Sequence, residues 1–259
     1  MMIPELFRII QTEISRWQKH LGLVDWEFYI KSLPKKTGRN STLEVDFEHK
    51  KATLSIMEKW NSVEQIKRII AFRMISIICQ RDKIESERLY LRRLDLEDAD
   101  VEWELQSNPQ VSIYDGHAPL ANRAELMRKL TLMCDDPCTF GIVKKDDNKL
   151  IGHTGIRPPH NLNNYTMEMG YAVHPDYWGQ GYATEVAKAL IDYCFINLNM
   201  EYVVAAHFEN NEASRRVLEK AGMIFEGIEP KAYEHEILGL IDLYNYRISK
   251  KEWKENNAR

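Results

Sequence analysis

The sequence predicts a mixed α/β (α+β) protein with two domains, a small one at residues 1–84 and a larger one at residues 86–259. Apolar residues repeat with helical spacing in some segments and alternate with polar residues in others, as they do in half-buried strands. Residues 81–85 are polar, and a new alternating segment follows them. Because domain boundaries fall in short polar stretches, we place the boundary there.

The small domain begins with an amphipathic helix and ends with a helix that is apolar nearly all round. Between them, three alternating segments predict strands, and the last two flank a charged turn, as in a β-hairpin. A polar loop is expected at residues 32–41, and Ser62 with Gln65 has the spacing of a capping box. The predicted elements are a helix at 4–21, strands at 26–30, 43–47 and 52–56, and a helix at 62–80.

The larger domain mixes helices and strands along the chain. Residues 108–119 are expected to form a loop between two early helices, and residues 145–148 a hairpin turn between two strands. The predicted helices are 96–106, 122–134, 183–198 and 211–221, and the predicted strands are 86–92, 139–144, 150–156, 165–173, 202–207, 224–226 and 237–248.

Composition and charge exclude several classes of function. No apolar run approaches the roughly 18 residues of a membrane span, and the first four residues lack the pattern of a signal peptide. The four cysteines are scattered, which favours buried or free thiols and a cytoplasmic location. Residues 1–85 hold 15 Lys and Arg against 11 Asp and Glu, whereas residues 86–259 hold 20 against 28. An acidic larger domain attracts cationic acceptors and disfavours nucleic acid.

Residues 177–185 combine a strand end, two glycines and a helix start. Gly179 and Gly181 allow a close approach to backbone N–H groups, and the following helix dipole adds positive potential. The stretch therefore predicts a phosphate-binding site, with a simple tight turn as the alternative. Thr184 stands where a dinucleotide fingerprint needs Gly or Ala, and no P-loop pattern occurs in the chain.

Five segments of the larger domain carry motifs in a fixed order: 86–92, 150–152, 168–185, 211–222 and 251–253. With these motifs the chain resembles the GNAT superfamily of acetyltransferases, in the branch of the Rim-type ribosomal-protein N-acetyltransferases. The resemblance covers residues 86–259. It implies a central, mostly antiparallel twisted sheet flanked by helices, and acetyl-CoA as cosubstrate.

The resemblance also implies residues that bind acetyl-CoA. The backbone of Ala172 and Val173 would pair with the pantetheine arm, and Asn211 would bind the same arm from the next helix. Trp178 takes the place of the usual Gln or Arg in the pyrophosphate motif. The cradle for the pyrophosphate would consist of Trp178, Gly179, Gln180, Gly181, Tyr182, Ala183 and Thr184.

Two residues are candidates for catalysis. Glu168 would accept the proton of the attacking amine; the alternative is that Glu168 is a surface or structural carboxylate. Glu234 and Glu236 are weaker candidates for the same role. Ser214 would stabilise or protonate the leaving thiolate; the alternative is a cap at the start of its helix. A backbone N–H near Val173 would meet the oxyanion.

Other residues are given lesser roles. The larger domain is expected to place Trp103, Tyr114 and His117 in the acceptor cleft. His174 is expected to be a loop residue, and His235 to lie in a solvated turn.

The small domain also resembles a minimal zincin in its order of helix, strands and buried helix. Phe72 to Ser76 would replace the zincin motif His-Glu-x-x-His, so both metal-binding histidines and the glutamate base are absent. A zincin-like domain would therefore be a scaffold or docking piece without metal; an unrelated α+β extension is the alternative.

Taken with the resemblance, these features predict an N-acetyltransferase that acts on a primary amine: a peptide N-terminus, a polyamine or an aminoglycoside-like compound. The alternative is a CoA-binding sensor or adaptor with little turnover, whose N-terminal domain recruits a partner. We expect no nucleic-acid or membrane partner, no metal, and a homodimer as one possible assembly. The sequence alone does not identify the acceptor.

Overall fold

A computed structural model of the chain describes residues 4–33, 41–57, 62–160 and 165–258. It divides into two compact units, Met1–Arg81 with Pro158–Asn164, and Asp82–Arg157 with Tyr165–Arg259. The second unit thus begins four residues before Ser86 and leaves out a short internal segment. Arg68 accounts for part of this grouping, because its Nε donates to the Pro158 carbonyl at 3.0 Å. Most of the loop expected at 32–41 lies outside the described residues.

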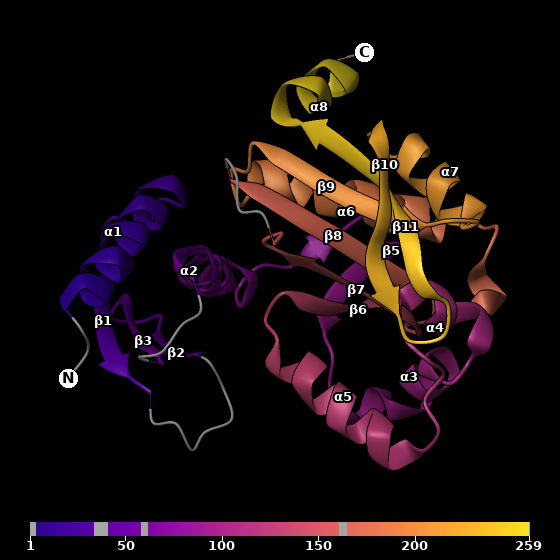
Figure 1. Cartoon of the computed structure of the whole chain (residues 1–259), viewed down its shortest axis with the longest axis horizontal. Helices are drawn as coiled ribbons and strands as arrows, with labels where there is room; N and C mark the ends of the chain where they lie inside the picture. Colours follow the sequence, from indigo (N-terminus) through magenta and orange to yellow (C-terminus); the bar gives the residue numbers. More distant parts are fainter. Residues whose placement is uncertain (1–3, 34–40, 58–61, 161–164, 259) are drawn as a thin grey trace. The chain divides into compact units, whose positions relative to one another are not determined.

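The first unit is a three-stranded sheet with two helices in the described residues (Figure 1). Its elements are α1 (Pro4–His20), β1 (Glu27–Ser32), β2 (Ser41–Asp46), β3 (Lys51–Ile56) and α2 (Val63–Cys79). The central strand β3 pairs antiparallel with β2, as expected for the hairpin, and parallel with β1. The core is formed by apolar faces of the helices and the sheet, including Ile10, Trp17, Leu54, Ile70 and Met74.

Helix α2 begins at the predicted cap, since the Ser62 side chain accepts from the Gln65 backbone N–H at 3.1 Å. At the position of the zincin motif, Met74 and Ser76 are fully buried, and Arg73 donates from Nε to the Ser41 hydroxyl. The described residues contain no group of three His, Cys, Asp or Glu side chains that could hold a metal ion.

The second unit is built on a sheet with eight strands in its described part, in the order β10-β11-β9-β8-β7-β6-β5-β4. Neighbouring strands are antiparallel except β8 and β9, which are parallel (Figure 1). The prediction of a mostly antiparallel sheet is therefore confirmed. The strands are β4 (Ile84–Glu85), β5 (Leu89–Arg93), β6 (Thr139–Lys144), β7 (Leu150–Arg157), β8 (Thr166–Val173), β9 (Tyr202–Phe208), β10 (Ile224–His235) and β11 (Gly239–Ser249).

Helices cover both faces of this sheet. Ala172 of β8 packs with Leu105 and Val111 in one apolar cluster, whereas β8 carries α6 on its other face. Because side chains alternate along a strand, Tyr171 and Val173 point away from the cluster that holds Ala172. The helices are α3 (Ala99–Gln106), α4 (Pro109–Asp115), α5 (Arg123–Asp135), α6 (Tyr182–Ile196), α7 (Glu212–Lys220) and α8 (Lys250–Asn257).

The loop predicted at 108–119 was wrong in its first half, which is helix α4. The Asn108 side chain accepts from the Gln110 N–H, Pro109 occupies the first helical position, and Gly116 ends the helix at a φ of 89°. All three local signals are present in the sequence, but the helix is only two turns long.

The end of β10 also differs from the prediction, because the strand continues to His235 after an irregularity between Glu229 and Tyr233. His235 is buried rather than in a solvated turn. Its Nδ1 accepts from the N–H groups of Ile237 and Leu238, so its Nε2–H donates to the Ile113 carbonyl at 2.9 Å. The imidazole therefore joins the hairpin turn to α4.

Three of the four cysteines, Cys79, Cys138 and Cys194, are buried, as expected. Among the helices that the structure describes, none is both long and apolar enough to span a membrane.

Candidate active site

The parallel strands β8 and β9 are paired at only one end. Their register runs from Thr166 opposite Tyr202 to Glu168 opposite Val204 and then stops, while β9 continues along β11 to Phe208. Beyond Glu168, the β8 edge that faces β9 has no partner strand in the described part of the chain. About five residues of extended backbone, roughly 17 Å, thus have no strand beside them on that side in the described residues.

The residues whose backbone faces this open edge follow from the strand alternation. Tyr165 accepts from the Glu201 N–H on the β9 side, whereas the His174 N–H donates to the Ile151 carbonyl on the β7 side. Odd-numbered residues of β8 therefore direct N–H and C=O toward the open edge. Tyr171 and Val173 present these groups there, but the Ala172 carbonyl points to β7.

The indole of Trp178 closes the far end of the open edge. Its Nε1–H donates to the Val173 carbonyl at 2.6 Å, and the half-exposed ring lies between β8 and the glycine turn. This contact explains how Trp can stand at the position where the acyl-CoA motif has Gln or Arg: it fixes the turn to the strand.

The glycine turn leaves the start of α6 without a side-chain cap. Gly179 and Gly181 have φ angles of 75° and 84°, and Gly181 is the N-cap residue of α6. A glycine offers no side-chain oxygen to the first N–H groups of the helix, whereas Asn211 and Ser249 cap α7 and α8. The predicted phosphate-binding turn thus has the conformation and open donors that an anion site needs.

A half-buried carboxylate holds this turn against the segment between β4 and β5. Glu185, in the first turn of α6, accepts from the Ser86 hydroxyl, the Arg88 backbone N–H and Arg88 Nε, each at 2.7 Å. Burial alone would raise the pKa of Glu185, but these hydrogen bonds outweigh it and lower the pKa. The glutamate of the motif therefore has a structural contact.

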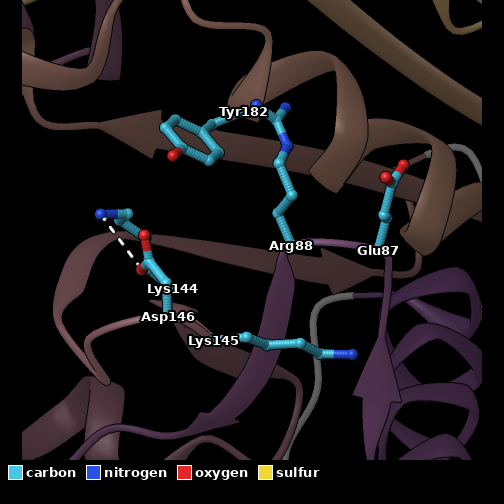
Figure 2. A pocket seen from close by; sticks show the side chains of 6 residues that line it. All are labelled: Glu87, Arg88, Lys144, Lys145, Asp146 and Tyr182. Atoms are coloured by element: carbon cyan, nitrogen blue, oxygen red, sulfur yellow. Dashed lines mark ion pairs between the residues drawn. The ribbon is translucent and has the colours of Figure 1, made fainter.

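Arg88 also reaches the glycine turn itself. Its Nη1 donates to the Gln180 carbonyl at 3.1 Å, and its guanidinium lies over the ring of Tyr182 (Figure 2). Tyr182 is buried, so its predicted contribution to the cradle is its backbone N–H. A pocket of about 300 Å³ lies here, lined by Glu87, Arg88, Lys144, Lys145, Asp146 and Tyr182.

Asn211 and Ser214 lie at the start of α7. The Asn211 side chain caps the helix by accepting from the Ser214 backbone N–H at 3.0 Å, so the cap is Asn211 and not Ser214. The Ser214 hydroxyl is half-buried and lies 3.0 Å from the phenol oxygen of Tyr171 on β8. Tyr171 is a site residue that the sequence reasoning missed, although it lies within a quoted motif.

Glu168 lies where the two strands separate. It is half-buried, opposite Arg157 on β7 and Val204 on β9. Strand alternation directs its side chain to the face that carries α3 and α4, away from the face of Tyr171 and Ser214. The two predicted catalytic residues thus lie on opposite faces of β8, at the same open edge.

Comparison with known proteins identifies the family of this unit. The family described as "Acetyltransferase (GNAT) domain" matches residues 88–224, more than half of the chain. This chain belongs to the GNAT acetyltransferase family. The N-acetyltransferase p20 of Bacillus licheniformis, uncharacterized in function, is 30% identical over 177 residues, covering 66% of this chain and 98% of its own.

Solved structures share the GNAT fold. An acetyltransferase of the GNAT family from Bacillus anthracis superposes with a TM-score of 0.61 at 26% identity, over 66% of this chain and 99% of its own. RimJ of Mycobacterium smegmatis, solved with CoA-disulfide, superposes with a TM-score of 0.58 over 67% of this chain and 90% of its own. At 17% identity, RimJ supports the fold alone.

On the predicted acceptor side of the GNAT domain, the loop after α4 is tied to β10. The Ala118 N–H donates to Glu236 at 2.8 Å, and the Tyr233 hydroxyl donates to the Gly116 carbonyl at 3.1 Å. Both Glu234 and Glu236 are exposed, and Glu236 has a structural partner in the Ala118 N–H. The three predicted cleft residues lie on α3, α4 and the loop after α4: Trp103 beside Arg123, Tyr114 exposed, and His117 3.2 Å from Asp115.

A cluster of two carboxylates and two basic side chains lies next to this loop, and the sequence did not reveal it. His153 of β7 lies 3.1 Å from the carboxylate of Glu102 on α3 and 3.8 Å from that of Asp115 on α4. Lys129 of α5 lies 3.7 Å from Asp115 and donates to Gln106. The charges of two carboxylates and two basic side chains, from four elements, thus compensate one another. The cluster lies beside Ala172, which is the cross-strand partner of His153.

Burial opposes the charged form of His153, but the carboxylates of Glu102 and Asp115 outweigh it and raise the pKa of His153 to about 10. Burial likewise opposes ionisation of Asp115, yet His117 and His153 lower its pKa below the usual range. His153 is therefore a cation and Asp115 an anion at neutral pH.

Proposed function

We propose that this acetyltransferase transfers the acetyl group of acetyl-CoA directly to a primary amine, either a protein N-terminus or a small-molecule amine. The observation that carries the proposal is the open edge of β8, which is followed, after the turn at residues 174–181, by the uncapped start of α6. An extended arm that ends in a phosphate fits these two features together, because the strand edge binds the arm and the helix start binds the phosphate.

The proposed contacts keep most of the predicted residues. The N–H groups of residues 179–184 hold the pyrophosphate, and the backbone of Val173 and Tyr171 pairs with the pantetheine arm. Tyr171 replaces Ala172 in this role, because the Ala172 carbonyl points to β7. Asn211 reaches the arm from α7. The side of β8 that carries α3 and α4 receives the amine.

The chemistry requires a neutral amine and a stabilised thiolate. Deprotonating an α-amine of pKa near 8 costs about 1 kcal/mol at pH 7, and a lysine-like amine roughly 4–5 kcal/mol. Glu168 accepts this proton, directly or through water, from the acceptor side. A backbone N–H of the open edge, at Val173, binds the oxyanion of the tetrahedral intermediate. Ser214 then donates a hydrogen bond to the departing thiolate from the opposite face.

Turnover tests the proposal. The chain is incubated with acetyl-CoA and a panel of amines that contains ribosomal N-terminal peptides, polyamines and aminoglycosides, and free thiol is followed. We expect thiol release above the amine-free rate for at least one acceptor. Binding of acetyl-CoA without release for any acceptor would contradict the proposal and favour a CoA-binding sensor, the alternative function.

The role of Glu168 is tested by Glu168→Gln, which keeps the side-chain size and removes the base. We expect kcat/KM for the best amine to fall about 30-fold to 100-fold, with acetyl-CoA binding unchanged. Glu234→Gln is the matched control on the acceptor side and is expected to leave kcat/KM within about threefold. If Glu234→Gln has the larger effect, Glu168 is not the base.

A further inference from the structure

The contact between Tyr171 and Ser214 joins the two sides of the opening between β8 and β9. Tyr171 extends from β8 past the point where the β8–β9 ladder ends, and Ser214 extends from the first turn of α7. Their hydroxyl oxygens are 3.0 Å apart. The backbones on the two sides have separated here, so this side-chain hydrogen bond is a direct link across the opening.

The backbone of Ser214 is fixed independently of this contact. Its N–H donates to the Asn211 side chain at 3.0 Å, and helix α7 follows at once. What remains to be set is the rotation of the Ser214 hydroxyl, which has one proton to donate and two lone pairs to accept with. A partner that donates to Oγ leaves the hydroxyl proton available for a third group.

Tyr171 has the properties of such a partner. Burial raises the pKa of Tyr171 to about 12, so the phenol keeps its proton throughout the neutral range. Its position on the strand is fixed by the cross-strand pair with Thr154, whose hydroxyl donates to the neighbouring Gly170 carbonyl at 2.7 Å. The phenol is therefore a proton-bearing group held in place beside Ser214.

We infer that Tyr171 is a positioning residue that donates to Ser214 Oγ and thereby aims the Ser214 proton at the leaving thiolate. A hydroxyl that accepts a hydrogen bond is polarised and becomes a better donor in turn. Tyr171 acts through Ser214 and does not touch the sulfur. This inference rests on the role proposed above for Ser214.

A double-mutant cycle of Tyr171→Phe and Ser214→Ala tests the inference. Tyr171→Phe keeps the ring and removes only the hydroxyl. We expect it to lower kcat about tenfold with the best amine, with KM for acetyl-CoA within about twofold, because the lost interaction acts on the departing thiolate. In the Ser214→Ala background, the same change is expected to lower kcat less than twofold, since no hydroxyl is left to orient. Ser214→Thr keeps a hydroxyl and should retain the tenfold effect of Tyr171→Phe.

Tyr90→Phe is the matched control. Tyr90 is a half-buried tyrosine of β5 in the same sheet, and its hydroxyl also donates to a single side chain, that of Asn148. The Tyr90→Phe variant should leave kcat unchanged. Its thermal unfolding midpoint should match that of the Tyr171→Phe variant within a few degrees.

The outcomes separate the inference from the proposed function. An equal loss of kcat from Tyr171→Phe in both backgrounds, or no loss in either, overturns the inference and leaves the proposed function intact if Ser214→Ala is impaired. Full activity of Ser214→Ala contradicts the proposed role of Ser214 and overturns the inference with it.

Discussion

Gly152→Ala is expected to destabilise the GNAT domain by about 3 kcal/mol or more and to abolish tight binding of acetyl-CoA. Gly152 lies on β7 directly opposite Val173 of β8, next to an irregularity in the β6–β7 register at Ile142 and Val143. A Cβ at this position would lie 2.1 Å from the Ala172 carbonyl oxygen and 3.0 Å from the Val173 Cα. Both are backbone atoms, so no side chain can rotate away.

The clash must push β8 away from β7 at the residues that present the open edge. Stability and acetyl-CoA affinity should therefore fall together, as measured by thermal or urea unfolding of the full chain and by titration with acetyl-CoA. Gly170→Ala is the control, because it lies on β8 and a Cβ there meets no atom within 4 Å. A Gly152→Ala variant with the parent's stability and affinity would show that β7 and β8 are not packed this closely.

His153→Leu is expected to lower the free energy of unfolding of the GNAT domain by about 3–5 kcal/mol at pH 6. The change leaves Glu102, whose side chain is 0% exposed, without its cationic partner. Breaking one half of a buried ion pair costs much more than replacing both halves, because the remaining charge is desolvated and unpaired. The double variant Glu102→Leu with His153→Leu should therefore recover most of the loss.

The pH dependence gives the same cluster a second test. The folded pKa of His153, about 10, is above its ordinary value. Its stabilisation is thus complete below about pH 6.5 and is lost as the pH rises toward that folded value. The pKa of Asp115 is lowered, so the pH dependence has the opposite direction. The stabilisation that Asp115 provides is complete above about pH 4 and is lost as the pH falls below that value.

We expect the stability difference between the parent and His153→Leu to shrink steadily from pH 6 to pH 10, as followed by urea unfolding at each pH. A difference that stays constant over this range would mean that His153 is neutral in the folded protein. Because His153 lies opposite Ala172, the variant should also weaken acetyl-CoA binding.

The elements that the sequence predicted well are those with strong local signals. Helix α5 begins at the predicted Asn122, which caps it, and the strands around residues 145–148 form the predicted hairpin. Helix α4 was missed because it spans only seven residues and offers no apolar repeat. The far part of β10 was missed because nine of its twelve residues are exposed, so no burial pattern marks it.

In the candidate site too, one part follows from local sequence and another depends on the tertiary structure. The glycine turn is a local feature, and Gly179 and Gly181 adopt positive φ angles of 75° and 84°, which glycine tolerates best. The direction of each backbone group in β8 is not local, because it depends on the register with β7 and on where β9 separates. We predicted that the backbone of Ala172 pairs with the pantetheine arm, but the register turns the carbonyl of this residue toward β7.

The sequence alone predicted the fold class, the acetyltransferase family and a turn that we propose binds phosphate, because these predictions rest on periodicity, turn residues and motif spacing within short segments. Only the tertiary structure decided which groups meet across the sheet: Tyr171 with Ser214, Gly152 with Val173, and His153 with Glu102 and Asp115. The partners in these pairs are between 21 positions (Gly152 and Val173) and 51 positions (Glu102 and His153) apart, and no local pattern encodes such a contact. Strand pairing and helix packing bring them together, and burial then turns their proximity into hydrogen bonds and compensated charge.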